Sequence, residues 1–293
     1  MIRKLVKRIS SKSLFENIEE YDKVAKIQAA LLTMWKQDSE LFDELDVQNI
    51  IWNKVYLHRF LLRQHGNVKK TIEMVKETLI WRKEKRIPHI IPSAVPREIY
   101  DLGPMITHGT DRDGNVVLYI RLKCLFVIEE TKESNIRLLM ARVFSTFEEG
   151  LANNKGFVLF YDATDVTMAN YHLAEALDAF RIFQKYVPSG LTKIVFYNLT
   201  WYARSLIKPA FALLQNELRK MLHFVNKNDV DKIISPKSLP PFITDPATKY
   251  KIPRPPDVKD IDHCDLELIG VKLEDREAYK AFIEKLLDYY NIC

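Results

Sequence analysis

The chain has 293 residues, 47% of them hydrophobic and 28% charged, which suffices for one large core or for a helical subdomain beside an α/β domain. No apolar stretch approaches the roughly 20 residues that span a bilayer, and the chain starts with charges instead of an apolar signal core, so we predict a soluble, cytoplasmic protein. The cysteines lack the spacing of a metal or redox site and are expected to be free thiols in a reducing compartment: Cys124, Cys264 and Cys293.

The formal net charge is +5, and five cations that precede the first acid, Glu16, supply this excess within a basic N-terminal segment, residues 1–18. Its cations lie beside apolar residues at helical spacing, whereas a nucleic-acid binder would spread a basic stripe over its folded surface. We therefore predict no nucleic-acid partner and a transient contact with an anionic membrane surface, made by Arg3, Lys4, Lys7 and Arg8. A solvated tail and a mitochondrial transit peptide are the alternatives.

Residues 19–92 are predicted to form a helical subdomain. Apolar residues recur every three or four positions over residues 19–37, 49–63 and 68–85, as is typical of amphipathic helices. Three prolines, the last at position 96, then mark the connection to the rest of the chain.

The pattern changes over residues 93–246. Short apolar runs at residues 116–120, 157–161 and 194–197 predict strands, and helical patterns lie between them. Strands that alternate with crossover-length helices predict an α/β domain with a mainly parallel or mixed sheet, flanked by helices. Residues 247–293 are predicted to be a proline-rich linker and a C-terminal amphipathic helix that docks or recruits a protein partner.

The sequence offers little catalytic chemistry. The seven histidines are scattered, and none has the spacing of a metal site. Asp162 and Asp165 follow a predicted strand, where α/β enzymes hold acids, but acids at this position also cap the next helix, and we favour that role. We predict that the protein is not an enzyme and that it binds no metal and no cofactor, apart from a hydrophobic ligand carried as cargo.

Residues 56–63, YLHRFLLR, and residues 109–119, GTDRDGNVVLY, resemble the N-terminal helical segment and the first hairpin of one family, the CRAL-TRIO (Sec14-like) lipid-binding family. Residues 186–191, YVPSGL, are similar to its strand entry, and residues 201–214 to its mobile gate helix. The resemblance implies an α/β CRAL-TRIO fold, in which a helical subdomain precedes a sheet and a gate helix lies over a hydrophobic pocket.

Two details concern the branch of the family and the ligand. Residues 227–230 and 239–241 look most like the motile-sperm-domain-containing members. Members that hold phosphatidylinositol typically place a lysine on the gate helix. An alignment without gaps puts Phe211 at that position, and Lys208 could fill the role only if three residues were deleted upstream, so the sequence leaves binding of that lipid open.

The resemblance and strand alternation together yield candidate site residues. The expected pocket lining is Tyr119, Phe157, Phe160, Tyr161, Phe196, Trp201, Leu206, Ile207, Phe211 and Leu214. The expected basic rim for a lipid headgroup is Arg59, Lys208, Arg219 and Lys220. The implied function is to carry or sense a lipid between membranes as a peripheral cytoplasmic protein. The alternatives are an interaction module without lipid transfer, and a hydrolase or transferase that uses the two aspartates.

Overall fold

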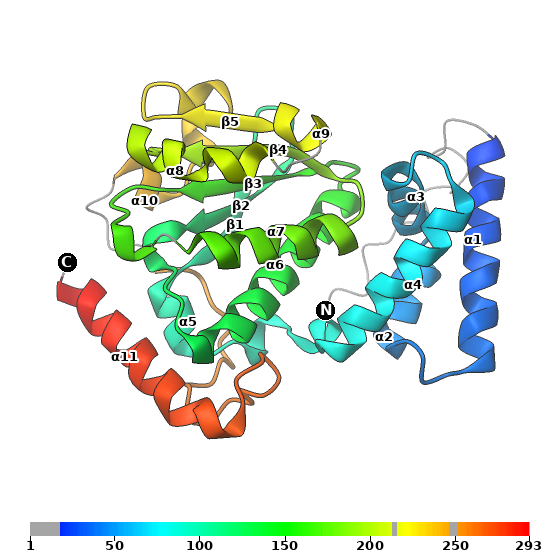
Figure 1. Ribbon diagram of the computed structural model, residues 1–293, viewed down its shortest axis with the longest axis horizontal. Coiled ribbons are helices and arrows are strands. Elements are labelled where there is room, and N and C mark those ends of the chain that lie inside the picture. Colours follow the sequence, from blue (N-terminus) through cyan, green and yellow to red (C-terminus); the bar gives the residue numbers. More distant parts are fainter. Residues whose placement is uncertain (1–17, 171, 213–215, 246–250, 293) are drawn as a thin grey trace. The chain divides into compact units, whose positions relative to one another are not determined.

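The computed structural model describes residues 18–170, 172–212, 216–245 and 251–292, without the side chains of residues 206, 208–212 and 290–292 (Figure 1). The predicted membrane-contact residues Arg3, Lys4, Lys7 and Arg8 lie outside these ranges. Among the described helices, none is both long and apolar enough to cross a membrane. The chain divides into two compact units. The first, the helical unit, consists of the chain up to Pro88 together with residues 151–154 and 181–190. The second, the α/β unit, consists of the other residues.

The helical unit is built on α1 (Ile18–Gln37), α2 (Glu44–Asp46), α3 (Lys54–Arg63) and α4 (Val68–Glu84). The three predicted helices are present, but the second begins late, because residues 49–53 form a π-helical turn and a cap. Asn53 and Asn67 cap α3 and α4 through their side-chain oxygens. The apolar faces meet in a buried core that includes Ile27, Leu31, Leu57, Phe60 and Leu79.

Two interactions give the helical unit its specific geometry. Arg82 of α4 donates to both carboxylate oxygens of Asp46, each at 2.8 Å, and both side chains are almost fully buried. Trp81 stacks on Tyr186 with ring centroids 4.7 Å apart, which holds residues 181–190 against α4. The unit therefore combines a hydrophobic core with one buried ion pair.

The α/β unit contains a five-stranded mixed sheet in the order β1-β2-β3-β4-β5. The strands are β1 (Met105–Thr110), β2 (Val116–Arg121), β3 (Phe157–Asp162), β4 (Leu191–Tyr197) and β5 (Leu222–Val225). β1 runs antiparallel to β2, and the other neighbours are parallel. The crossovers are α6 (Lys132–Ala152), α7 (Leu173–Tyr186), and α8 (Trp201–Ala212) with α9 (Asn216–Lys220). The predicted α/β fold with a mixed sheet is confirmed.

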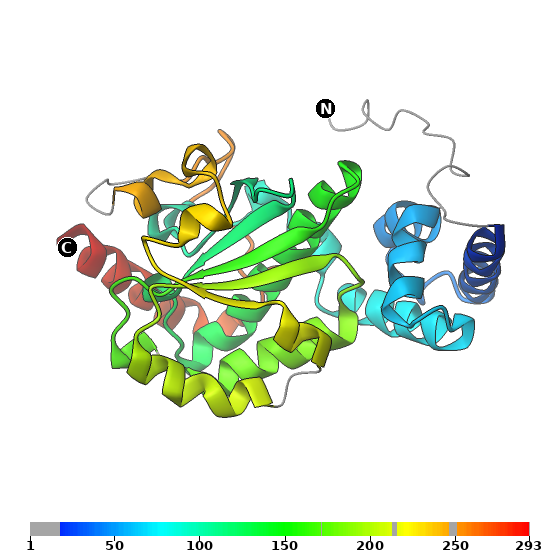
Figure 2. The ribbon, with the colours of Figure 1, turned by 90° about the horizontal axis from the view of Figure 1, so that it is seen from above.

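The two faces of the sheet have different coverings (Figure 2). α7 and α8 lie on one side, and the gold-to-orange segment after β5 lies on the other. On the second side the core cluster joins sheet residues to the segment after β5, whose buried members include Ile234, Phe242 and Ile243. On that side six residues of β2, β3 and β4 have at most 3% exposure: Val117, Tyr119, Val158, Phe160, Val195 and Tyr197.

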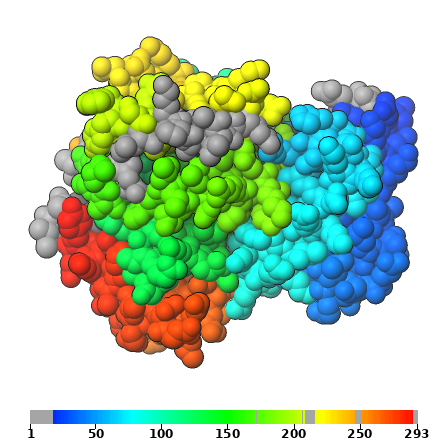
Figure 3. Space-filling model, in the orientation of Figure 1, coloured from blue at the N-terminus to red at the C-terminus, as the bar shows by residue number. Residues whose placement is uncertain are grey.

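The C-terminal helix α11 (Arg276–Ile292) packs on α5 (Arg97–Leu102) and so belongs to the α/β unit. In Figure 3 the red-to-orange C-terminal part of the chain lies against its green part. Its buried side chains Tyr279, Ile283 and Leu286 belong to the core cluster. The segment before it is also anchored, because the amide of Ile261 donates to the buried Glu98 carboxylate at 2.9 Å. A partner would have to bind the other face of α11, and a partner at this helix stays a prediction.

The turn between β1 and β2 is organised by Asp111, whose side chain is fully buried. Its carboxylate accepts from the Asn115 amide at 2.8 Å and from Lys193 Nζ at 2.6 Å. Burial raises the pKa of this carboxyl, but the hydrogen bonds from Lys193 and Asn115 and the lysine charge outweigh burial and lower it overall. The ionised form is therefore favoured in the folded protein.

We expect Asp111→Asn to reduce the loss of stability in acid. Because the folded pKa is lower than the unfolded value, ionised Asp111 stabilises the fold above the unfolded pKa, near 4, and this contribution disappears as the pH falls through the folded pKa. The variant should cost about 1–3 kcal/mol at pH 7, and its stability should change less between pH 7 and pH 3 than that of the parent, by urea unfolding. Asp113→Asn is the control, because Asp113 shares Lys193 but is 71% exposed. An unchanged pH profile in Asp111→Asn would contradict the prediction.

Candidate functional site

Three aromatic residues on adjacent strands form a row on the face that α7 and α8 cover. We call Tyr161, Phe196 and Phe224 the aromatic row. In the strand register Phe196 of β4 is paired with Tyr161 of β3 on one side and with Phe224 of β5 on the other. The Tyr161 and Phe196 rings stack at 5.1 Å and 13°, and the Phe196 and Phe224 rings at 5.5 Å and 16°. All three side chains are only partly buried, in contrast to the opposite face. The row is an ordered apolar surface that its own chain covers incompletely.

The helices over this face are also incompletely buried. Among the described side chains of α8, only Ala203 is buried. Arg204 of α8 lies over the Phe224 ring, 4.0 Å from its centroid, which fixes one turn of this helix above the row. In the part of α7 that belongs to the α/β unit, no described side chain is buried, and Leu177 and Phe180 are half-buried.

The side chain of Tyr161 is largely shielded from water by surrounding protein. Burial raises the pKa of this phenol to about 12. The side chain nevertheless keeps accessible surface, whereas its neighbour Phe160 has none. Tyr161 is therefore largely surrounded by protein and keeps some accessible surface.

Large apolar side chains are exposed where β3 and β4 end. The two strands are parallel neighbours, so the segments that leave them start at the same edge of the sheet. Met168, Leu173 and Trp201 stand in these segments and are 64%, 41% and 81% exposed. We call these three residues the exposed apolar edge.

Comparison with known proteins identifies the domain. Residues 100–243 match the family model of the CRAL/TRIO domain, and this span includes all five strands and the aromatic row. The chain contains a CRAL/TRIO domain. The crystal structure of Sfh5 superimposes with a TM-score of 0.55 at 17% sequence identity, over 74% of this chain and 84% of that chain, and supports the fold.

Two curated relatives that this chain matches are from Arabidopsis thaliana. Patellin-1 is 36% identical over 66 residues, and patellin-2 is 25% identical over 163 residues. The matches cover 22% and 50% of this chain but only 11% and 23% of the patellins. These likenesses give no support to the finer resemblance to the motile-sperm-domain-containing members, which stays a prediction from residues 227–230 and 239–241.

The structure separates the predicted lining residues of the CRAL/TRIO domain. Tyr119 and Phe160 lie on the opposite face, where the Tyr119 ring is 6.0 Å from that of Phe242, so the expectation that they share one surface with Phe196 is wrong. Phe157 packs edge-on against Phe147 of α6, with ring centroids 6.3 Å apart, and is fully buried. Adjacent residues of a strand point to opposite faces, so Phe160 and Tyr161 cannot line the same surface.

The predictions for the gate helix have mixed outcomes. Trp201, expected in the lining, is 81% exposed at the start of α8, while Ile207 is half-buried, and a lining role of either residue stays a prediction. The side chains of Leu206, Lys208 and Phe211, and the whole of Leu214, lie outside the described residues. Their roles stay predictions. Phe224 was missed because β5 is only four residues long and shows no strand pattern of its own.

The predicted basic rim is divided between the two units. Arg59 belongs to the helical unit, where burial lowers the pKa of its guanidinium. Arg219 and Lys220 are exposed on α9 of the α/β unit, and Arg219 donates to Asn216 at 2.8 Å. A common rim is not established and stays a prediction.

The two aspartates after β3 stabilise local structure. Asp162 is 3% exposed and accepts from the Thr164 amide at 3.0 Å, so it caps the turn after the strand and not the following helix as predicted. Burial raises the pKa of its carboxyl. Asp165 is exposed and pairs with Lys123 at 3.1 Å. Within the described ranges, no group of three metal-ligating side chains is assembled.

Proposed function

We propose that this chain binds a phospholipid or similar lipophilic ligand between the aromatic row and helices α7 and α8, and that it carries or senses this ligand at membranes without catalysis. One observation carries the proposal: under these helices three stacked aromatic side chains, those of Tyr161, Phe196 and Phe224, are only partly buried, while Tyr119, Phe160 and Tyr197 on the other face have at most 3% exposure. CRAL/TRIO domains typically bind lipophilic ligands, which agrees with this contrast.

The energetics of such a site suit a lipid tail. Burial contributes about 0.8 kcal/mol for each CH₂ group, so a chain of about sixteen carbons gains on the order of 10 kcal/mol. An acyl chain requires no directional partner, and the three stacked rings offer a continuous apolar floor. Specificity for the tail would then follow from shape.

The exposed apolar edge supports exchange at a membrane. Met168, Leu173 and Trp201 precede or begin the two helices above the row, so insertion of this edge into a bilayer would bring the lipid site to the membrane. Tryptophan is well suited to the interface between headgroups and acyl chains. The peripheral membrane association proposed here rests on this edge.

Extraction of bound lipid tests the proposal. We expect protein that has been incubated with mixed phospholipid vesicles and repurified to carry about one lipid per chain, measured by mass spectrometry of organic extracts, which also names the lipid class. Transfer of a fluorescent phospholipid from donor to acceptor vesicles then distinguishes a carrier from a sensor. Trp201→Glu should slow this exchange and leave the extracted lipid unchanged, because Trp201 lies at the edge and not in the row. Protein that remains free of lipid would favour an interaction module.

A further inference from the structure

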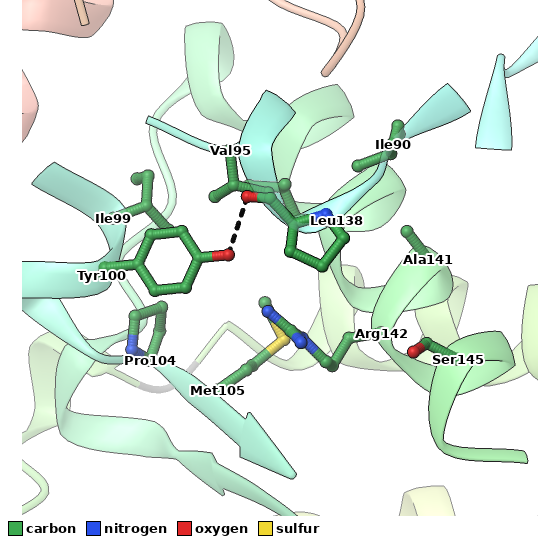
Figure 4. Close-up of a pocket in the computed structure, with 11 residues that line it drawn as sticks. Ile90, Val95, Ile99, Tyr100, Pro104, Met105, Leu138, Ala141, Arg142 and Ser145 are labelled. Atoms are coloured by element: carbon green, nitrogen blue, oxygen red, sulfur yellow. Dashed lines mark hydrogen bonds between the residues drawn. The ribbon is translucent and has the colours of Figure 1, made fainter. Parts of the chain in front are cut away.

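A second apolar cleft lies away from the aromatic row, between residues 90–95, α5, the start of β1, and α6 (Figure 4). The space over its lining is about 540 Å³ when it is counted out into the solvent at its mouth, and the cavity proper is about 50 Å³. Its floor is formed by the buried side chains of Val95, Tyr100 and Leu138. Its walls are half-buried and belong to Ile90, Ile99 and Met105, with the 55% exposed Ile91 next to them in sequence. All lining residues belong to the α/β unit.

One cation enters this apolar cleft. Arg142 extends from α6 into the cleft, close to the Tyr100 hydroxyl (Figure 4). That hydroxyl donates to the Pro92 carbonyl at 2.8 Å and accepts from Arg142. A guanidinium carries five N–H donors in a planar fork that matches a carboxylate, so this single contact leaves most of them available.

No acid in the described part of the chain neutralises Arg142. No carboxylate pairs with it there, and the residues one turn away on α6 are uncharged: Leu138, Leu139, Ser145 and Thr146. Other arginines of this unit do have acidic partners; Arg137 of the same helix pairs with Glu133 at 2.7 Å, and Arg254 with Asp101 at 2.8 Å. Arg142 is thus a half-buried positive charge surrounded by apolar side chains.

We infer that this cleft binds a peptide segment of a partner protein that presents a carboxylate beside leucine-sized apolar side chains. The apolar walls favour burial of the side chains, and the Arg142 guanidinium, which the Tyr100 hydroxyl contacts, offers a fork of N–H donors for the carboxylate. The cleft is partly open to solvent, so a side chain of a longer peptide can enter it from outside.

Charge and shape argue against two other occupants of the cleft, the N-terminal segment of this chain and a membrane surface. The N-terminal segment of this chain is no match, because every charged residue before Glu16 is a cation. A flat bilayer would reach the exposed Ile91 but would not place a phosphate against a cation within a concave site. The cleft is separate from the aromatic row, so the inference does not depend on the proposed lipid function.

Methyl NMR with a defined peptide pair tests the inference. The probes are a short acetylated and amidated peptide in which leucines flank one glutamate, and its glutamine counterpart. We expect the glutamate peptide to shift the methyl signals of Ile90, Ile99 and Met105 saturably, and to bind at least about fivefold more tightly than the glutamine peptide. Arg142→Gln should abolish this preference, Arg142→Lys should retain part of it, and Arg112→Gln, which removes an arginine from the β1–β2 turn, should leave it unchanged.

Three outcomes would overturn the inference. The first is an absence of shifts at these methyl groups with the glutamate peptide at millimolar concentration. The second is equal binding of the two peptides by the parent. The third is a shift of the same methyl signals by anionic vesicles, lost in Arg142→Gln and absent with either peptide, which would assign the cleft to a membrane. Circular dichroism spectra that match the parent show that each variant is folded, so a lost preference reports on binding.

Discussion

Phe196→Asp is expected to reduce the lipid recovered from the purified protein by about tenfold or more. Phe196 is the middle member of the aromatic row, with Tyr161 and Phe224 stacked on either side of it. A carboxylate at this position would lie against the acyl chain, and an unpaired polar group buried in apolar surroundings costs more than the roughly 1.4 kcal/mol that corresponds to a tenfold change. The measurement is the lipid-to-protein ratio in organic extracts after incubation with mixed vesicles.

The control for this variant is Trp52→Asp. Trp52 is 59% exposed in the helical unit, so the substitution has the same chemistry on a surface that the proposal does not use, and lipid recovery should equal that of the parent. A milder variant, Phe196→Ala, removes the ring without adding charge and should have an intermediate effect. Folded Phe196→Asp protein with parental lipid content would show that the row is not the ligand site.

The sequence predicts the framework of the α/β unit better than its surfaces. β2, β3 and β4 are short apolar runs between helical patterns, which is why they can be recognised. The alternation of adjacent residues already separates Phe160 from Tyr161. The sequence does not show whether Phe160 or Tyr161 points toward α8, because this depends on which side of the sheet the segment after β5 covers. In the structure Phe242 and Ile243 of that segment pack on the side of Phe160.

Other features escape sequence reasoning for physical reasons. The amphipathic pattern of α11 predicts a helix with one apolar face, but it does not say whether that face meets a partner or the same chain; Tyr279 and Ile283 show that it meets the same chain. The cleft that contains Arg142 could not be predicted from the sequence either. Arginines with and without acidic partners look alike in a sequence, because partners such as that of Arg254 can be more than a hundred residues away.

The largest loss of stability is expected from Asp46→Asn. The Asp46 carboxylate and the Arg82 guanidinium are 1% and 5% exposed and form two hydrogen bonds of 2.8 Å. Removing the negative charge leaves a buried guanidinium without its counterion, which costs about 3–5 kcal/mol. Replacing both residues, as Asp46→Leu with Arg82→Met, should cost much less, because no charge is then left in the core.

The four tryptophans make this measurement specific to the helical unit. Trp201 is the only one in the α/β unit, so in a Trp201→Phe background urea unfolding followed by fluorescence reports on the helical unit alone. Glu40→Gln is the matched control, because Glu40 is 90% exposed and pairs at 3.3 Å with Lys83, the neighbour of Arg82. An exposed pair contributes no more than about 1 kcal/mol. If Asp46→Asn cost no more than Glu40→Gln, the buried pair would not be a source of stability, and the hydrophobic core of α1, α3 and α4 alone would hold the unit together.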